Sequence, residues 1–431
     1  MATPLFRHIL IALLICTMRL DGDVAIDVVQ RDLTTTSGVL LEIDGDSIRF
    51  TGEDGTISSL PLEMIAFIEL ITPEEDTTGV SGVLLMKNLD QPPLEIKVTG
   101  VDERSIQFSV ENGVIRTLPF KMIDFISTDS KPLPAGFPSS GALRLVDGGV
   151  LTGRTQESTD GFTWRNWWTG PITMTVEEIA SFTRPSTNGV VESSDMDDVV
   201  SLSNGDRIVG FIDSIDHETI TIEKADGTVL TVPLENADQV LLANRITPES
   251  GSTLWSNVGD RFMVDSILYD VENGFQVDGR PMSASLISGV AFANTGITPL
   301  CAFPITLEET SDTPRFHLPE PRILTGSTRM DVSTIELKGP VRALWEFDQT
   351  DLGLICTLMV PPSSRRHADM VIRVLGGGEL LASFEMNDSN PTADVALRIP
   401  GKTLAIEIID SGGGPIMDDI NIQGVVMFET Q

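Results

Sequence analysis

The stretch Ser47-Ile48-Arg49-Phe50, followed by Gly55 and by Leu60-Pro61-Leu62-Glu63, decides how roughly the first three hundred residues are organised. Two further copies keep the same order: Ser105-Ile106-Gln107-Phe108, Gly113 and Leu118-Pro119-Phe120-Lys121, then Thr219-Ile220-Thr221-Ile222, Gly227 and Val232-Pro233-Leu234-Glu235. In all three copies, seven positions separate the Ile from the Gly and six separate that Gly from the Pro. Chance rarely produces such spacing, so the chain is a repeat protein.

The copy at 197–246 shows the complete unit. Its Asn204-Gly205 and Asp226-Gly227 steps are typical of hairpin turns between alternating segments. Gly210, in the middle of a strand, predicts a bulge or a sharp bend, and Pro233 ends a strand. About five short strands in fewer than fifty residues predict a small, strongly bent barrel.

Two degraded copies bring the number of units to five. Repeats one and two occupy 26–130, and the others occupy 139–184, 197–246 and 254–295. The repeated pattern resembles the Sm-like and SH3-like small β-barrels, which implies a shape for each unit but no function. We expect every unit to fold around its own small interior, and the repeats to act as a spacer or an interaction array.

The charge of the chain restricts its partners. Its 431 residues include 29 basic and 63 acidic side chains, a net charge of −34. Such a field repels phosphate groups, which argues against nucleic acid and anionic membrane surfaces. Cations, neutral sugars and basic protein patches remain compatible, and so does the simpler role of keeping an exported protein soluble.

The N-terminus has the features of a signal peptide over residues 1–25. Arg7 and His8 precede an apolar run, Ile9 to Cys16, that is too short to span a bilayer. Since no later stretch is long and apolar enough for a transmembrane helix, we expect an exported protein of the periplasm, cell surface or medium. After export Cys301 and Cys356 remain, as one disulfide or as two separate buried thiols.

A Pro-rich linker is expected at 296–324, and the residues from 325 to 431 differ in character from the repeats. Seven apolar segments there alternate with Asp, Gly, Pro and Ser turns, which is typical of a β-sandwich. The expected strands are Val341 to Phe347, Leu352 to Val360, Met370 to Leu375, Leu380 to Met386, Ala393 to Ile399, Thr403 to Ile409 and Ile420 to Phe428. The predicted fold class is therefore all-β: tandem five-stranded small barrels followed by a C-terminal jelly-roll sandwich.

Several segments of this C-terminal region resemble NPCBM, the galactose-binding-like carbohydrate-binding module of family-98 glycoside hydrolases. The segments are Ile335-Glu336-Leu337-Lys338-Gly339, the run from Asp369 to Leu381, the run from Leu404 to Gly414, and Asp418-Asp419. The family usually carries a His after the Lys-Gly step, and a His and a Trp beside the acidic pair. Here Pro340 follows Gly339 and Ile420 follows Asp419, so the resemblance implies the sandwich framework more firmly than it implies sugar binding.

A sugar site needs an aromatic face and planar polar groups. In the sandwich the candidates are Trp345 with Asn387, Asp388 and Asn390, the alternative for Trp345 being core packing.

A second aromatic patch lies in the third unit. Strand alternation places Trp167 beside Arg165 on one face, away from Phe162 and Trp164, and predicts an exposed stacking or protein-contact site.

Asp410, Asp418 and Asp419 flank a Gly-rich turn and are candidate ligands for a structural calcium ion. Their alternative role is turn formation. No other cofactor is expected.

Catalytic motifs are missing from the sequence, since the His residues lack metal-ligand spacing and no nucleophile elbow or Walker loop occurs. We therefore expect a non-catalytic exported protein whose sandwich binds carbohydrate or a cell-surface glycan. One alternative is a structural or assembly protein of the cell envelope, with the sandwich as a protein-contact module. The other is a glycoside-hydrolase-type enzyme that uses a carboxylate pair.

Overall fold

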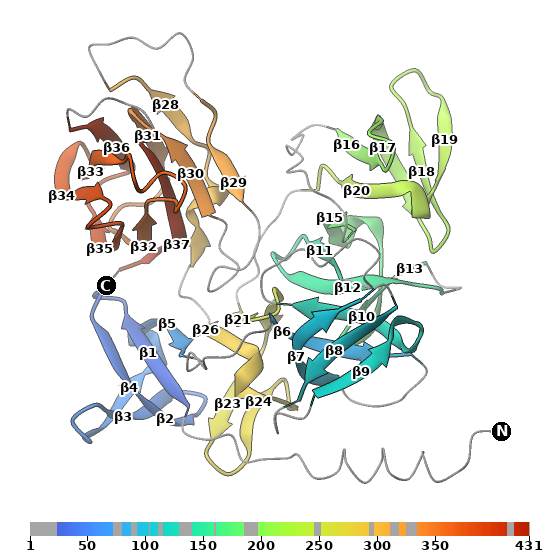
Figure 1. The fold of residues 1–431 in the computed structure, drawn as a ribbon, viewed down its shortest axis with the longest axis horizontal. Helices are drawn as coiled ribbons and strands as arrows, with labels where there is room; N and C mark the ends of the chain where they lie inside the picture. The colour runs from blue at the N-terminus through green and yellow to red at the C-terminus, as the bar shows by residue number, and fades with distance from the viewer. Residues whose placement is uncertain are drawn as a thin grey trace.

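The computed structural model describes residues 24–71, 80–87, 93–102, 104–110, 115–128, 140–158, 161–184, 197–244, 251–292, 297–310, 319–324, 334–411 and 418–430. Strands dominate, and the helices are single 3-10 turns, which confirms the all-β class (Figure 1). Within these residues no helix is long and apolar enough to cross a membrane.

Each repeated unit contains five strand positions, with a 3-10 turn between the fourth and the fifth. The first unit contains β1 (Ala25–Gln30), β2 (Thr35–Ile43), β3 (Ser47–Gly52), β4 (Ile57–Pro61), η1 (Leu62–Met64) and β5 (Ile65–Leu70). The second contains β6 (Val80–Met86), β7 (Leu94–Val101), β8 (Ser105–Ser109), β9 (Ile115–Pro119), η2 (Phe120–Met122) and β10 (Ile123–Thr128). The third contains β11 (Gly141–Leu145), β12 (Val150–Gln156), β13 (Phe162–Asn166), β14 (Gly170–Met174), η3 (Val176–Glu178) and β15 (Ile179–Thr183).

The last two units follow the same plan, with the fourth strand pairing the third and the fifth strand pairing the first. The fourth unit contains β16 (Asp198–Leu202), β17 (Arg207–Ile215), β18 (Thr219–Glu223), β19 (Val229–Pro233), η4 (Leu234–Asn236) and β20 (Ala237–Leu241). The fifth contains β21 (Ser252–Ser256), β22 (Arg261–Val264), β23 (Ile267–Asp270), β24 (Gly274–Val277), β25 (Arg280–Met282), η5 (Ala284–Leu286) and β26 (Ile287–Ala291); its second strand is divided into β22 and β23.

The repeated residues account for this plan. The Ile of each copy is fully buried, as Ile48, Ile106 and Ile220. Gly227 forms the hairpin turn at a φ of 80°, in the left-handed region that suits glycine. Pro233 then ends the fourth strand and precedes the 3-10 turn, because proline cannot donate to a ladder.

Gly210 marks a bend, as predicted. At this residue β17 stops pairing with β16 and begins to pair with β18, so one strand serves both halves of the barrel. A Cβ at this position would lie 2.3 Å from the backbone oxygen of Glu223, which leaves room only for glycine.

The units do not each enclose a separate interior, and in this respect the expectation from the sequence is wrong. The fifth strands pair between units, β5 with β26 and β15 with β20. Buried side chains of all five units then join one continuous core, although the second unit also has a small core of its own. The physical reason is size, because a unit of under fifty residues buries too little apolar surface to stand alone.

The C-terminal part is a sandwich of two sheets, and all seven strands predicted for it are present. One sheet has the order β29-β30-β37-β32-β35, with β27 also paired to β37, and the other has the order β28-β31-β36-β33-β34. The bounds are β27 (Thr298–Pro299), η6 (Leu300–Ala302), β28 (Thr306–Glu308), β29 (Arg322–Leu324), β30 (Thr334–Lys338), β31 (Val341–Glu346), β32 (Leu352–Met359), β33 (Asp369–Gly376), β34 (Glu379–Asn387), β35 (Thr392–Ile399), β36 (Thr403–Asp410) and β37 (Asp419–Glu429).

The segment 296–324, expected to be a linker, supplies β27, β28 and β29 to the sandwich. Its prolines suggested a connector, but short edge strands tolerate proline where a backbone N–H is not needed.

The sandwich is joined to the repeats through an apolar contact. Phe67 of β5 meets Phe428 of β37 edge to face, with ring centroids 6.3 Å apart. Trp255 and Ala291 of the fifth unit belong to the same buried cluster as the sandwich interior. The sandwich therefore rests on the paired first and fifth units.

Candidate functional site

The two ends of the sandwich carry different polar residues. Strand register places the loops 347–351 and 400–402 at one end, together with the end of β37. The opposite end carries the loop after β34, the end of β36 and the start of β37.

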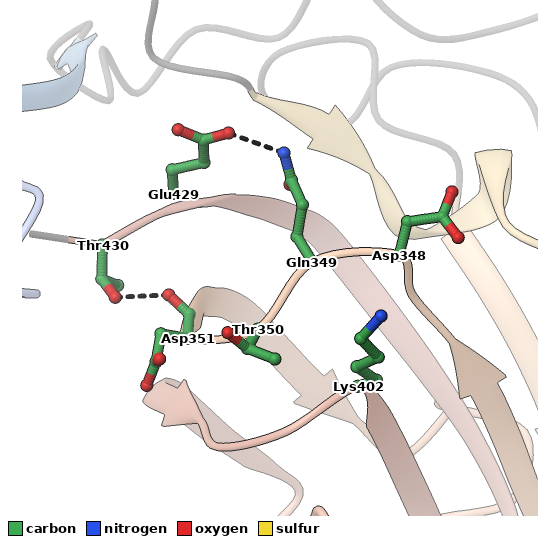
Figure 2. A pocket seen from close by; sticks show the side chains of 7 residues that line it. All are labelled: Asp348, Gln349, Thr350, Asp351, Lys402, Glu429 and Thr430. Atoms are coloured by element: carbon green, nitrogen blue, oxygen red, sulfur yellow. Dashed lines mark hydrogen bonds between the residues drawn. The ribbon is translucent and has the colours of Figure 1, made fainter.

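The first of these ends is hollowed by a cavity of about 450 Å³, which we name the terminal pocket (Figure 2). Its lining residues are Asp348, Gln349, Thr350, Asp351, Lys402, Glu429 and Thr430. They come from three segments that are far apart in the sequence and meet because β31, β32, β36 and β37 end here.

Hydrogen bonds hold the three segments together. The N–H of Phe347 donates to the backbone oxygen of Lys402 at 2.8 Å, and the N–H of Thr430 donates to that of Asp351 at 3.3 Å. Gln349 Nε2 donates to Glu429 Oε1 at 2.7 Å, a bond visible in Figure 2. These bonds shape the pocket before any ligand arrives.

The pocket is open to solvent, and polar or charged side chains line it. It carries three carboxylates against the one ammonium group of Lys402. Asp351 pairs with Arg398 at 3.3 Å, so that carboxylate is partly neutralised. Asp348 and Lys402 are exposed and have no ion-pair partner among the described residues, which leaves an acceptor and a donor available to a ligand.

The sugar-site residues predicted from the sequence do not meet at this pocket. Trp345 is fully buried between the sheets, so it offers no face to a ligand. Asn387, Asp388 and Asn390 lie at the opposite end of the sandwich. There Asn387 Oδ1 accepts hydrogen bonds from the N–H groups of Ser389 and Asn390 at 2.9 and 3.0 Å, so this side chain forms its own turn.

The predicted calcium ligands also lie at that opposite end. Asp418 is buried, one of its carboxylate oxygens has no hydrogen-bond partner, and burial raises its pKa to about 6, with further contributions from Asp410, Asp369 and Asp419. Asp419 accepts a hydrogen bond from Ser364 at 3.1 Å. The described residues hold no group of three side chains arranged as metal ligands, and 412–417 lie outside them, so calcium stays a prediction.

Trp167 is not the exposed platform that the strand pattern predicted. It is 5% exposed, and its Nε1 donates to Asp260 Oδ2 at 2.5 Å. The pattern failed because β13 ends at Asn166, so strand alternation does not continue to residue 167.

Asp260 is the centre of a buried network that joins three units. It accepts hydrogen bonds from the N–H and hydroxyl of Thr152, from Asn166 and from Ser256, in addition to Trp167. Ser127 of the second unit donates to the Thr152 hydroxyl at 2.9 Å. The network therefore links the second, third and fifth units through buried hydrogen bonds.

Arg165 also joins units. It pairs with the buried Asp124 of β10 at 3.1 Å, and Arg154 pairs with the same carboxylate. Both residues of the predicted contact patch therefore hold the second, third and fifth units together.

Cys301 and Cys356 are free thiols in the structure, with Cys356 buried and Cys301 half-buried, which favours separate thiols over the disulfide. Cys356 is buried in β32, and burial raises its pKa to about 12. A bridge needs closely placed Cβ atoms, which sequence position does not reveal.

The pocket residues were missed because they come from three segments that are far apart in the chain. The only local signal was the polar run Asp348-Gln349-Thr350-Asp351 between two apolar strands. Nothing in the sequence indicates that Lys402 and Glu429 would join that run.

Comparisons with known proteins give distant similarities only. No family model matches the chain, the family-98 module included, and no curated protein matches it. One similar solved structure is a CBM51 carbohydrate-binding module from Clostridium perfringens GH95 in complex with methyl-galactose, at 14% identity and a TM-score of 0.24, covering 30% of this chain and 99% of that one. Another is CBM51-2 with GlcNAc and INT domains from Clostridium perfringens ZmpB, at 10% identity and a TM-score of 0.25, covering 64% and 45%.

An exo-beta-1,3-galactanase from Phanerochaete chrysosporium, solved with galactose, is similar at 8% identity and a TM-score of 0.21, covering 91% of this chain and 89% of that one. At such values these similarities lead to no conclusion about ligand or activity. The function is therefore argued from the terminal pocket.

Proposed function

We propose that the C-terminal sandwich binds a carbohydrate in the terminal pocket and that the protein does not transform it. The observation that carries the proposal is a pre-shaped cavity lined only by side chains that donate or accept hydrogen bonds. Sugar hydroxyls do both, so they match carboxylates, an amide, threonine hydroxyls and an ammonium group placed around one opening.

The charge of the pocket favours one class of sugar. Three carboxylates against one ammonium repel a ligand that is itself an anion. We therefore expect neutral or amino-bearing sugars to bind in preference to sugar acids. Because no aromatic ring lines the pocket, affinity should be weak, with a Kd on the order of a millimolar.

The pocket also supports binding over turnover. Glycosidases need one carboxylic acid whose pKa is raised by an apolar site. Asp348, Asp351 and Glu429 are all exposed to water, and none has such surroundings. Incubation with the bound glycan should therefore yield no hydrolysis product by chromatography.

A glycan array probed with the full chain tests the proposal. We expect retention of neutral or amino sugars, with Asp348→Asn weakening it by roughly tenfold. Asn390→Ala, at the other end of the sandwich, is the matched control and should bind like the wild type. Folded protein that retains no glycan, or binding that depends on Asn390 and not on Asp348, would refute the terminal pocket as the site.

The envelope-assembly alternative is less well supported for the sandwich. Large exposed apolar patches often mark the protein-contact surfaces of such modules. Among the described residues of the sandwich, Leu380 is the only large apolar side chain classed as exposed.

We further propose that the protein is exported. The basic and apolar character of the N-terminal segment supports this, although residues 1–23 lie outside the described part. The backbone oxygens of Val24 and Ala25 accept hydrogen bonds from Leu40 and Ile71, so cleavage after Ala25 would remove two bonds from the first unit. N-terminal sequencing of the secreted protein should find a start at or before Val24, and an intact Met1 in the cytosolic fraction would contradict export.

A further inference from the structure

The fourth unit exposes apolar side chains that the fold does not use. Phe211 is 66% exposed, Val229 is 60% exposed and Val209 is 48% exposed. Phe211 faces Glu223 across the β17–β18 ladder, and Glu223 faces Val229 across the β18–β19 ladder, so Phe211 and Val229 share one row of one sheet face. Val209 lies two residues before Phe211, on the other side of the bend at Gly210.

The same sheet ends in an open edge. Among the described residues β19 pairs only with β18, and its sequence Val229-Leu230-Thr231-Val232-Pro233 carries no charge. The fifth strand of the unit is already paired on both sides, with β16 and with β15. Figure 1 shows β17, β18 and β19 at the periphery of the molecule, away from the sandwich.

The surrounding charge indicates what could cover this surface. Residues 197–244 contain ten acidic side chains and two basic ones, Arg207 and Lys224, a net charge of −8. Two copies of the chain, each with a net charge of −34, repel each other, which opposes self-association. A basic partner is attracted instead.

The equivalent place in the second unit provides a comparison. Ile115 corresponds to Val229 and is 63% exposed. In that unit Lys97 faces Ser109, which faces Ile115, so a lysine occupies the position of Phe211. An exposed β-branched residue is thus common to both units, but β9 carries the basic Arg116, which repels a basic segment, whereas β19 carries no charge.

We propose that the open edge of β19, with the exposed side chain of Val229 beside it, is a docking surface for an extended basic segment of a partner protein, which adds to β19 as a further strand. Backbone pairing along β19 supplies affinity, and an apolar side chain of the segment packs on Val229, which ends the row beside the open edge. Lysines or arginines on the segment face the acidic surroundings, so binding weakens as salt is raised.

A short labelled peptide of alternating Lys and Val, titrated into the full chain by fluorescence anisotropy, tests this proposal. We expect saturable binding that falls by roughly tenfold in Val229→Ser and is unchanged in Ile115→Ser. Both side chains are exposed, so both variants should keep the wild-type melting temperature. A peptide with alternate backbone N-methyl groups on the pairing edge should not bind.

Three results would overturn the proposal. Equal binding by wild type and Val229→Ser would mean that the acidic chain attracts the peptide without this surface. Undiminished binding of the N-methylated peptide would exclude pairing with β19. Dimers seen by sedimentation in the wild type and lost in Val229→Ser would assign the surface to a second copy of the chain.

Discussion

Three aspartates at the same place in three units hold the turn between the second and third strands. Asp44, Asp102 and Asp216 each accept hydrogen bonds from the N–H groups two and three residues later, and from the hydroxyl three residues later. These bonds favour the ionised form and lower the pKa of each carboxyl. Asp260 behaves in the opposite way, because its burial outweighs its hydrogen bonds and raises its pKa to about 6.

The two environments make the folding stability depend on pH in opposite directions. The substitution Asp260→Asn removes the contribution of Asp260 alone. Its pKa of about 6 lies above the ordinary 3.8, so its contribution to stability is fully present below about pH 4 and is lost as pH rises through 6. The stability difference between wild type and variant should therefore be larger at about pH 4 than at about pH 7, by up to roughly 3 kcal/mol. Urea unfolding at both pH values measures it, and parallel pH profiles would contradict the assignment.

Calcium binding at the acidic end of the sandwich is testable through Asp418. A bound Ca²⁺ would neutralise this buried carboxylate, whose second oxygen lacks a partner, so the melting temperature should rise by a few degrees relative to chelator. Asp418→Asn should abolish the shift, whereas Asp388→Asn, an exposed carboxylate at the same end, should retain it. Identical melting curves with calcium and with chelator would show that no calcium ion binds at this end of the sandwich.

At the scale of elements, the first and fourth units each depend on one long strand that changes its pairing partner along its length. In the fourth unit β17 pairs with β16 before Gly210 and with β18 after it. Gly38 occupies the same place in the first unit, where an added Cβ would lie 2.5 Å from the backbone oxygen of Thr51. Backbone crowding therefore explains why these strands contain glycine where propensity alone disfavours it.

Gly210→Ala should destabilise the fourth unit by about 1–3 kcal/mol, because the new Cβ would have to displace the backbone of Glu223. Gly45→Ala is the matched control, since a Cβ there has no neighbour within 4 Å and its φ is not in the left-handed region. Chemical denaturation compares the two. Equal stability of both variants would show that the bend does not require glycine.

At the scale of the whole molecule, the chain is an interlocked body in which neighbours in sequence are not always neighbours in space. The first unit pairs with the fifth through β5 and β26, and the third pairs with the fourth through β15 and β20. Strand β10 of the second unit contacts the third unit through the ion pair of Asp124 with Arg165 and the hydrogen bond from Ser127 to Thr152. The sandwich then covers the paired first and fifth units.

Phe67→Ala should separate the sandwich from this body. Removing the ring deletes its contact with Phe428 and should cost about 3–5 kcal/mol. Calorimetry should then show the sandwich unfolding apart from the repeats.

Ile106→Ala, in the separate core of the second unit, is the control and should leave the sandwich transition at its wild-type temperature. A single transition in Phe67→Ala would mean that other contacts couple the two parts.

The sequence by itself determined the all-β class, the repeated hairpins and the seven main strands of the sandwich, because local alternation and turn residues such as Gly227 and Pro233 specify them. Only the tertiary structure decided that Trp167 is buried on Asp260 and that Lys402 and Glu429 meet Asp348 at one pocket. Local patterns report which side of a strand a residue takes, whereas a site depends on which distant strands end together. That arrangement arises from burial shared between units, which no single segment encodes.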